Sequence, residues 1–216
     1  MTRLDLRLGD RHEWVKVFDP RGASIFVATA APPAVGAEVR IDLTIEDGGP
    51  RVILRGTVLW IREVADGADP AGCAVGLSVD DREKVNFLNG FVRGGLLNRR
   101  ERRRLPLRLP VTYGGIDGPV QTWTRDLNEE GMFILSEAPL PEQTILHFVV
   151  AVPGREQPLE LKGTVSHTVI VEDDDVPGMG VRYVIDGPER AAELTAIVDA
   201  LEQDFLTGAL PDDVIS

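Results

Sequence analysis

The sequence has little cysteine, few aromatic residues and no long apolar run. Its single cysteine, Cys73, excludes an internal disulfide framework and a four-cysteine zinc site. No apolar stretch approaches the roughly 20 residues that a membrane-spanning helix needs. The first ten residues also lack the apolar core of a signal peptide. We therefore expect a protein of the cytoplasm that does not act in a membrane.

The sequence motifs of common catalysts are missing as well. There is no Gly-x-Ser-x-Gly elbow, no phosphate-binding P-loop and no His-Glu-x-x-His motif. The three histidines are not spaced as ligands of one metal ion, and the acidic run at 172–175 lacks the turn glycine of a calcium loop. We predict that the protein is not an enzyme and that it holds no metal or cofactor.

The charge of the chain is negative overall but unevenly distributed. The 216 residues suit one large domain or two of about 100 residues. The net charge of −12 makes a nucleic-acid polymer a poor partner, because its phosphates are also negative. Residues 1–97 carry a net charge of −2 and residues 98–216 a net charge of −10. Within that acidic half, five of the six residues from Arg99 to Arg104 are arginine. This local basic cluster needs a specific explanation.

The chain contains an internal repeat with an offset of 107 residues. At this offset aromatic, acidic and glycine positions recur in the same order in both halves. Asp19 matches Asp126, Phe26 matches Phe133, and 56–58 match 163–165, while Trp14 falls near Trp123. Two further matches, reached after small shifts, are LDLRL at 4–8 with LPLRL at 105–109, and AVGLSV at 74–79 with GMGVRY at 178–183. Several anchors in one order predict two homologous domains.

Each half has the pattern of a small antiparallel β domain. Short runs rich in β-branched or alternating apolar residues are separated by turns containing Gly, Pro and Asp. In the second half we expect strands near 105–113, 120–126, 132–136, 143–152, 158–171 and 178–185, then a helix over 187–206. The first half should end in a shorter helix after Asp80. The expected fold is mainly β: two tandem six-stranded antiparallel barrels, each followed by an α-helix, at 1–92 and 104–216 with a linker at 93–103.

An arginine-rich arm at 98–104 and an acidic turn at 125–133 carry the chemistry of the second half. Guanidinium groups donate paired hydrogen bonds to phosphates and stack on base faces. The carboxylate of Asp126 can accept hydrogen bonds from the edge of a guanine, and Gly131 allows either a close backbone approach or a positive φ. The arm and turn therefore suit a ligand with phosphates and guanines. Asp126 can also cap the turn, because Asp and Asn favour such positions.

The arm and the turn resemble the two signature motifs of PilZ domains, bacterial receptors for cyclic di-GMP. The family pattern is Arg-x-x-x-Arg before the first strand, followed by Asp/Asn-x-Ser-x-x-Gly on the barrel. Arg100 and Arg104 match the first motif. Asp126, Asn128 and Gly131 match the second, with asparagine where serine is usual.

The register of the first motif has rivals. Arg99 with Arg103, and Arg104 with Arg108, have the same spacing as Arg100 with Arg104. We prefer the pair Arg100 and Arg104 because Arg104 immediately precedes the expected first strand.

The resemblance implies a role for each matched residue. Arg100 and Arg104 would bind phosphate and guanine of cyclic di-GMP, and Asp126 would hold a guanine edge. Asn128 would take over the polar contact of the serine. Arg99 extends the first motif to Arg-Arg-x-x-x-Arg, a form associated in the family with two stacked ligand molecules. We therefore expect either one ligand molecule or a stacked pair.

The first half departs from both motifs. Arg3 matches Arg104, but only two residues precede it, so the arm is missing. At the second motif Asp19 is present, but Arg21 replaces the serine and Ser24 replaces the glycine. Because most charge-assisted contacts are lost, we expect this degenerate copy not to bind the ligand.

These expectations lead to two hypotheses. In the first, the protein is a cyclic di-GMP receptor that binds through its second domain, changes its interdomain arrangement as the arm orders, and signals to a protein partner, for example in motility. In the second, it is a ligand-independent adaptor that acts only through protein–protein interaction. Asn128 in the serine position and the degenerate first copy favour the second hypothesis.

Overall fold

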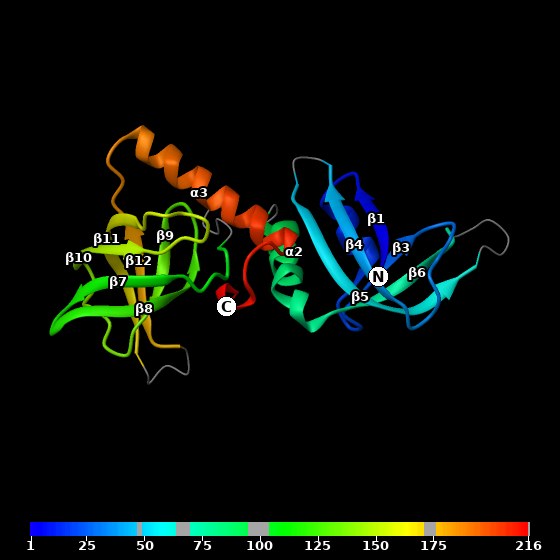
Figure 1. Cartoon of the computed structure of the whole chain (residues 1–216), viewed down its shortest axis with the longest axis horizontal. Helices are drawn as coiled ribbons and strands as arrows, with labels where there is room; N and C mark the ends of the chain where they lie inside the picture. The colour runs from blue at the N-terminus through cyan, green and yellow to red at the C-terminus, as the bar shows by residue number, and fades with distance from the viewer. Residues whose placement is uncertain (47–48, 64–69, 95–103, 171–175, 216) are drawn as a thin grey trace. The chain divides into compact units, whose positions relative to one another are not determined.

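The computed structural model describes residues 1–46, 49–63, 70–94, 104–170 and 176–215. The chain divides into two compact units. One comprises Met1–Glu101 and Gln203–Ala209, and the other comprises Arg102–Glu202 and Leu210–Ser216. Each unit contains its own six-stranded β-sheet (Figure 1).

The sheet of the second unit is a closed antiparallel barrel. Its strands are β7 (Pro110–Gly115), β8 (Gly118–Leu127), β9 (Gly131–Leu135), β10 (Ile145–Val150), β11 (Leu159–Val169) and β12 (Gly178–Tyr183). They pair in the order β10-β11-β12-β9-β8-β7, and β7 closes the ring onto β10. Buried and exposed residues alternate along β10, so that one face of the strand fills the core. The predicted six-stranded barrel is confirmed for this half.

The barrel is followed by the predicted helix, α3 (Pro188–Thr207). Pro188 suits the first turn of a helix because its missing N–H is not needed there. Leu194, Val198, Leu201 and Phe205 are buried at steps of three and four residues. Among the described residues, no helix is long and apolar enough to cross a membrane.

The first strand of the barrel is shorter than predicted, because β7 begins only at Pro110. Upstream of it, Leu105 and Leu107 form isolated bridges with Leu127 and Ile215. The prolines of this segment have no N–H to donate and so interrupt a continuous ladder. Both leucines are nevertheless fully buried, so the segment contributes to the core without being a strand.

The sheet of the first unit is built differently. Its strands are β1 (Thr2–Leu8), β2 (Phe18–Asp19), β3 (Ser24–Ala28), β4 (Glu38–Ile45), β5 (Arg51–Arg62) and β6 (Gly72–Leu77). Its helices are α1 (His12–Val17) and α2 (Arg82–Gly94), the helix expected after Asp80. The strand order is β1-β4-β5-β6-β3-β2, which places β1 and β2 at opposite ends of the sheet, and β1 runs parallel to β4. The first half therefore has the six strands that were predicted, but its sheet is not wholly antiparallel, and among the described strands no pairing closes it into a barrel.

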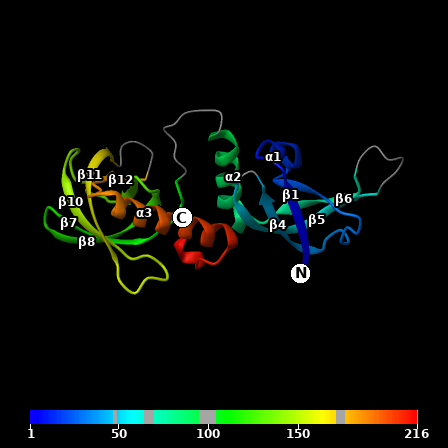
Figure 2. The ribbon, with the colours of Figure 1, turned by 90° about the horizontal axis from the view of Figure 1, so that it is seen from above.

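A helix after β1 explains this difference. The Asp10 carboxylate accepts hydrogen bonds from the backbone N–H groups of His12 and Glu13, at 2.6 and 3.2 Å. These bonds satisfy N–H groups at the start of α1, so the chain turns into a helix where the barrel needs a hairpin. Trp14 on α1 is 1% exposed and donates its Nε1–H to Asn89 on α2 at 2.9 Å, which packs the two helices side by side (Figure 2).

The remaining strands of the two sheets confirm the internal repeat. The ladder between β5 and β6 shifts register between Val58 and Trp60, and the ladder between β11 and β12 shifts between Val165 and His167. These irregularities are 107 residues apart, as the sequence offset predicts. The same offset therefore relates equivalent strands and equivalent β-bulges.

One sequence match needs correction by two residues. Val27 pairs with Cys73, and its counterpart Ile134 pairs with Met179. GMGVRY in β12 therefore corresponds to GCAVGL at 72–77 rather than to AVGLSV at 74–79. Both alignments keep small and apolar residues matched, so composition alone did not distinguish them.

Candidate functional site

The candidate site is built on the turn between β8 and β9. Asn128 holds this turn: its side chain is 5% exposed, and its Oδ1 accepts hydrogen bonds from the N–H groups of Glu130 and Gly131, at 2.9 and 3.0 Å. The N–H of Asn128 donates to the carbonyl of Gly131 at 2.9 Å. The Asn128 side chain oxygen is therefore used to shape the turn, as Asn side chains do in Asx turns.

Gly131 is required by a close backbone approach. A Cβ atom at this position would lie 2.3 Å from the carbonyl oxygen of Val181 on β12. Gly131 is paired with Arg182 in the ladder between β9 and β12. The sequence suggested either a close backbone approach or a positive φ for this glycine. The close approach applies, because the φ of Gly131 is not positive.

The turn presents an ion pair between two of the predicted site residues. Arg104 Nη1 lies 2.6 Å from Asp126 Oδ1, and Arg125 Nε lies 3.0 Å from Asp126 Oδ2. The Asp126 side chain is 15% exposed and the Arg104 side chain 45%. Both carboxylate oxygens thus have cationic partners, and the more exposed partner is Arg104.

Arg125 and Tyr183 belong to this site, although the sequence motifs do not include them. The guanidinium of Arg125 lies over the ring of Phe133, 3.8 Å from its centroid. Burial raises the pKa of the Tyr183 hydroxyl above its ordinary value of 10.0; Arg104 opposes this effect, whereas Asp126 adds to it. Two sequence features point to these residues: Tyr183 ends the segment GMGVRY, and Arg125 directly precedes Asp126.

Four of the six predicted site residues come together here: Arg104, Asp126, Asn128 and Gly131. Arg99 and Arg100 lie outside the described residues, as does the acidic run at 172–175. In the part of the chain that the structure describes, no group of three or more His, Cys, Asp or Glu side chains is arranged to hold a metal ion.

The first unit has no carboxylate in the position of Asp126. Phe18 pairs with Ile25 as Leu127 pairs with Met132, so Asp19 corresponds to Asn128 rather than to Asp126. Asp19 Oδ1 accepts the N–H of Arg21 at 2.9 Å, which is the same turn contact that Asn128 makes. The sequence match of Asp19 with Asp126 is therefore wrong, because the first hairpin loop is two residues longer.

The match between the two tryptophans is also wrong in structural terms. Trp14 is buried on a helix and stacks on Phe18, with 4.9 Å between ring centroids. Trp123 lies on β8, is 39% exposed, and has the guanidinium of Arg108 5.3 Å from its ring centroid. The two residues share a sequence neighbourhood but occupy different elements.

Comparison with protein families agrees with this geometry. The PilZ domain model matches residues 98–200, which include the barrel, the Arg104–Asp126 pair and the turn of Asn128. Residues 98–200 are a PilZ domain. No curated protein matches the chain.

Solved structures similar to the chain include two PilZ domains and an inhibitor of motility. The PilZ domain of CeSA from a cellulose-synthesizing bacterium is 22% identical, with 47% of this chain and 99% of that chain covered and a TM-score of 0.37. The PilZ domain of YcgR from Escherichia coli, solved with c-di-GMP, is 18% identical, with coverages of 50% and 94% and a TM-score of 0.39. The inhibitor of motility MotI/DgrA from Bacillus subtilis is 12% identical, with 84% of each chain covered and a TM-score of 0.42.

Proposed function

We propose that the protein is a cyclic di-GMP receptor and that its PilZ domain binds the ligand. The observation that carries the proposal is the Arg104–Asp126 pair, at 2.6 Å, beside a turn fixed by Asn128 and Gly131. A guanidinium and a carboxylate at one site supply donors for a phosphate and acceptors for a guanine edge. Arg99 and Arg100 join them on the strength of the sequence motif, with one ligand or a stacked pair bound.

The energetics of the ion pair favour its exchange for a ligand. Arg104 is the exposed member of the pair, so water screens its interaction with Asp126 and the pair contributes about 0–1 kcal/mol. A charge-assisted hydrogen bond to a ligand contributes about 1.5–3 kcal/mol. The Arg104 guanidinium can therefore leave Asp126 and bind a phosphate of the ligand. Asp126 then keeps its ion pair with Arg125 and accepts hydrogen bonds from the guanine N–H groups. In this scheme the apo pair keeps both groups in place until the ligand arrives.

The proposed role is that of a receptor in the cytoplasm rather than an enzyme. Ligand capture orders the arm at 98–104, which also joins the two domains, and so changes their arrangement and signals to a protein partner. Small-angle scattering with saturating cyclic di-GMP tests this signalling step. Identical profiles with and without ligand would contradict it.

Calorimetric titration with cyclic di-GMP tests the binding proposal. We expect a dissociation constant in the micromolar range or below for the natural chain. Arg104→Ala and Asp126→Ala should each weaken binding at least tenfold, because each removes charge-assisted contacts. Asp19→Ala, at the corresponding turn of the first unit, is the matched control and should bind like the natural chain.

One observation favours the adaptor as a second candidate. Both carboxylate oxygens of Asp126 and the side-chain oxygen of Asn128 already have partners without any ligand. An adaptor of this kind gives no heat with cyclic di-GMP, and its melting temperature does not change on addition of the ligand. In that case Arg104→Glu should leave partner binding intact.

A further inference from the structure

The outer face of the first unit carries a row of three polar residues across neighbouring strands. Arg7 on β1 pairs in register with Thr44 on β4, and Thr44 pairs with Arg51 on β5. Both arginines are exposed and Thr44 is half-buried, so all three point away from the core of the sheet. The row therefore places a hydroxyl between two guanidinium groups on a rigid scaffold.

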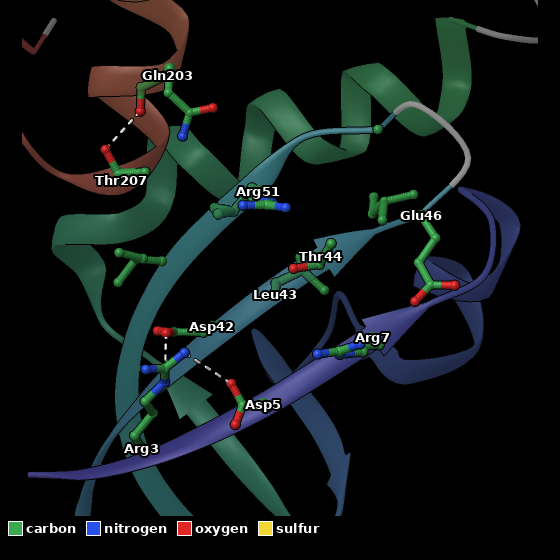
Figure 3. A pocket seen from close by; sticks show the side chains of 14 residues that line it. Arg3, Asp5, Arg7, Asp42, Leu43, Thr44, Glu46, Arg51, Gln203 and Thr207 are labelled. Atoms are coloured by element: carbon green, nitrogen blue, oxygen red, sulfur yellow. Dashed lines mark hydrogen bonds and ion pairs between the residues drawn. The ribbon is translucent and has the colours of Figure 1, made fainter.

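The row lines a cavity of about 720 Å³. Figure 3 shows Arg7, Thr44 and Arg51 on the exposed side of the strands, with Gln203 and Thr207 nearby. The latter two residues belong to the same unit as the sheet. The volume lies in the range of pockets that hold small molecules, about 300–1,000 Å³.

The acidic residues in the neighbouring row are already neutralised. Arg3 Nε lies 2.7 Å from Asp42 and Arg3 Nη2 lies 3.2 Å from Asp5 (Figure 3), and Arg40 Nε lies 2.6 Å from Asp42. These two arginines therefore compensate the two carboxylates of that row.

Arg7 and Arg51 have no such compensation. Over the described ranges of the chain, no carboxylate lies within ion-pair distance of Arg7 or Arg51. Glu46 lines the same cavity and has no ionic partner among the described residues (Figure 3). Counting only described residues, the cavity thus offers two cations and one carboxylate without an ionic partner, in a protein whose net charge is −12.

We propose that Arg7, Thr44 and Arg51 bind the phosphate group of a small phosphomonoester. Arg7 and Arg51 lie two strands apart, about 10 Å between backbones, so two guanidinium groups can hold one phosphate between them. The Thr44 hydroxyl supplies a further donor below that phosphate. Glu46 favours a ligand that also carries hydroxyl or amino donors, as a sugar phosphate or a nucleotide does. This site is separate from the PilZ domain and does not depend on the function proposed for it.

An NMR titration of the full chain tests this site at constant ionic strength. The probes are inorganic phosphate, ribose 5-phosphate and AMP, with ribose as the unphosphorylated control. We expect saturable shifts of the amides of residues 7, 44 and 51 with the phosphorylated probes and none with ribose. Ribose 5-phosphate or AMP should bind more tightly than inorganic phosphate.

Substitutions separate a specific site from general attraction of anions. Arg7→Gln and Arg51→Gln should each weaken ribose 5-phosphate binding about tenfold or more. Thr44→Val should weaken it less, because it removes one neutral donor. Arg21→Gln removes an exposed arginine of the same unit outside the cavity and is the matched control.

Equal, non-saturating shifts in the natural chain and in all three arginine variants would overturn the proposal. Shifts confined to Arg104 and Asp126 would overturn it too, because the probe would then be bound by the PilZ domain. The cyclic di-GMP affinity of the Arg7 and Arg51 variants should equal that of the natural chain, which separates this site from the proposed receptor function.

Discussion

Asn128→Ala should destabilise the second unit by removing the support of the β8–β9 turn. Asn128 Oδ1 accepts two backbone hydrogen bonds, from Glu130 and Gly131, and the side chain is 5% exposed. Each such bond contributes about 0.5–1.5 kcal/mol net, so losing both lowers the free energy of unfolding by about 2 kcal/mol. That loss corresponds to roughly a 30-fold shift of the folding equilibrium. The Gly131 amide should lose hydrogen-exchange protection by a similar factor, because its acceptor is gone.

Urea unfolding and amide hydrogen exchange measure these two effects. Asn128→Asp keeps an Oδ1 atom that can accept both hydrogen bonds and should retain most of the stability. Asn86→Ala is the matched control: Asn86 is exposed, and its amide lies 3.4 and 3.5 Å from Glu83 oxygens, so its loss should cost less than about 0.5 kcal/mol. If Asn128→Ala behaved like Asn86→Ala in both assays, the structural role of Asn128 would be refuted.

Three further substitutions test other parts of the fold. Gly131→Ala should lower the free energy of unfolding by about 1–3 kcal/mol in urea titration, because its Cβ would lie 2.3 Å from the Val181 carbonyl oxygen. Burial raises the pKa of Tyr183 above 10.0, so the unfolded chain loses this proton first and stability falls as pH rises above about 10. Tyr183→Phe should reduce that alkaline loss in urea titrations at pH 8 to 11.5. Lys84→Met should cost the first unit about 3–5 kcal/mol, since Lys84 Nζ lies 2.8 Å from Asp81 and both side chains are buried.

Each of these three substitutions has a matched control substitution elsewhere in the chain. Gly114→Ala should be tolerated, because nothing lies within 4 Å of a Cβ there, and a loss as large as that of Gly131→Ala would contradict the steric argument. The Tyr113→Phe variant retains Tyr183, so its stability should fall at alkaline pH as much as that of the natural chain. Lys16 is exposed, so Lys16→Met should leave the unfolding midpoint almost unchanged, and an equal effect of both lysine variants would refute the buried ion pair.

The second half could be predicted closely because its local signals agree with one another. Alternating strands, glycine turns and a Pro-initiated helix all favoured the closed barrel and α3. The missing part of the first predicted strand has a local cause: prolines near Leu105 and Leu107 remove ladder donors. The first half could not be predicted so well, because the pairing of β1 with β4 is parallel and depends on α1, whose six residues give a weak periodic signal.

The candidate site shows the same division between local and long-range information. The spacing of Asp126, Asn128 and Gly131 could be read from the sequence, and the structure brings Arg104 to Asp126. The sequence did not show that Asn128 shapes the turn while Asp126 forms the ion pair, because both residue types favour turns. Only strand register shows that Asp19 corresponds to Asn128. The first unit therefore lacks the carboxylate of the proposed guanine contact, although an aspartate is present in its sequence motif.

The central claim is that cyclic di-GMP binds the PilZ domain and not the first unit. Hydrogen–deuterium exchange of the full chain, with and without saturating cyclic di-GMP, tests this claim most directly. We expect slower exchange at Leu105, at 127–131 and at 182–184, around the Arg104–Asp126 pair, and unchanged exchange in β1 to β6. Unchanged exchange throughout the chain, or protection confined to the first unit, would contradict the account.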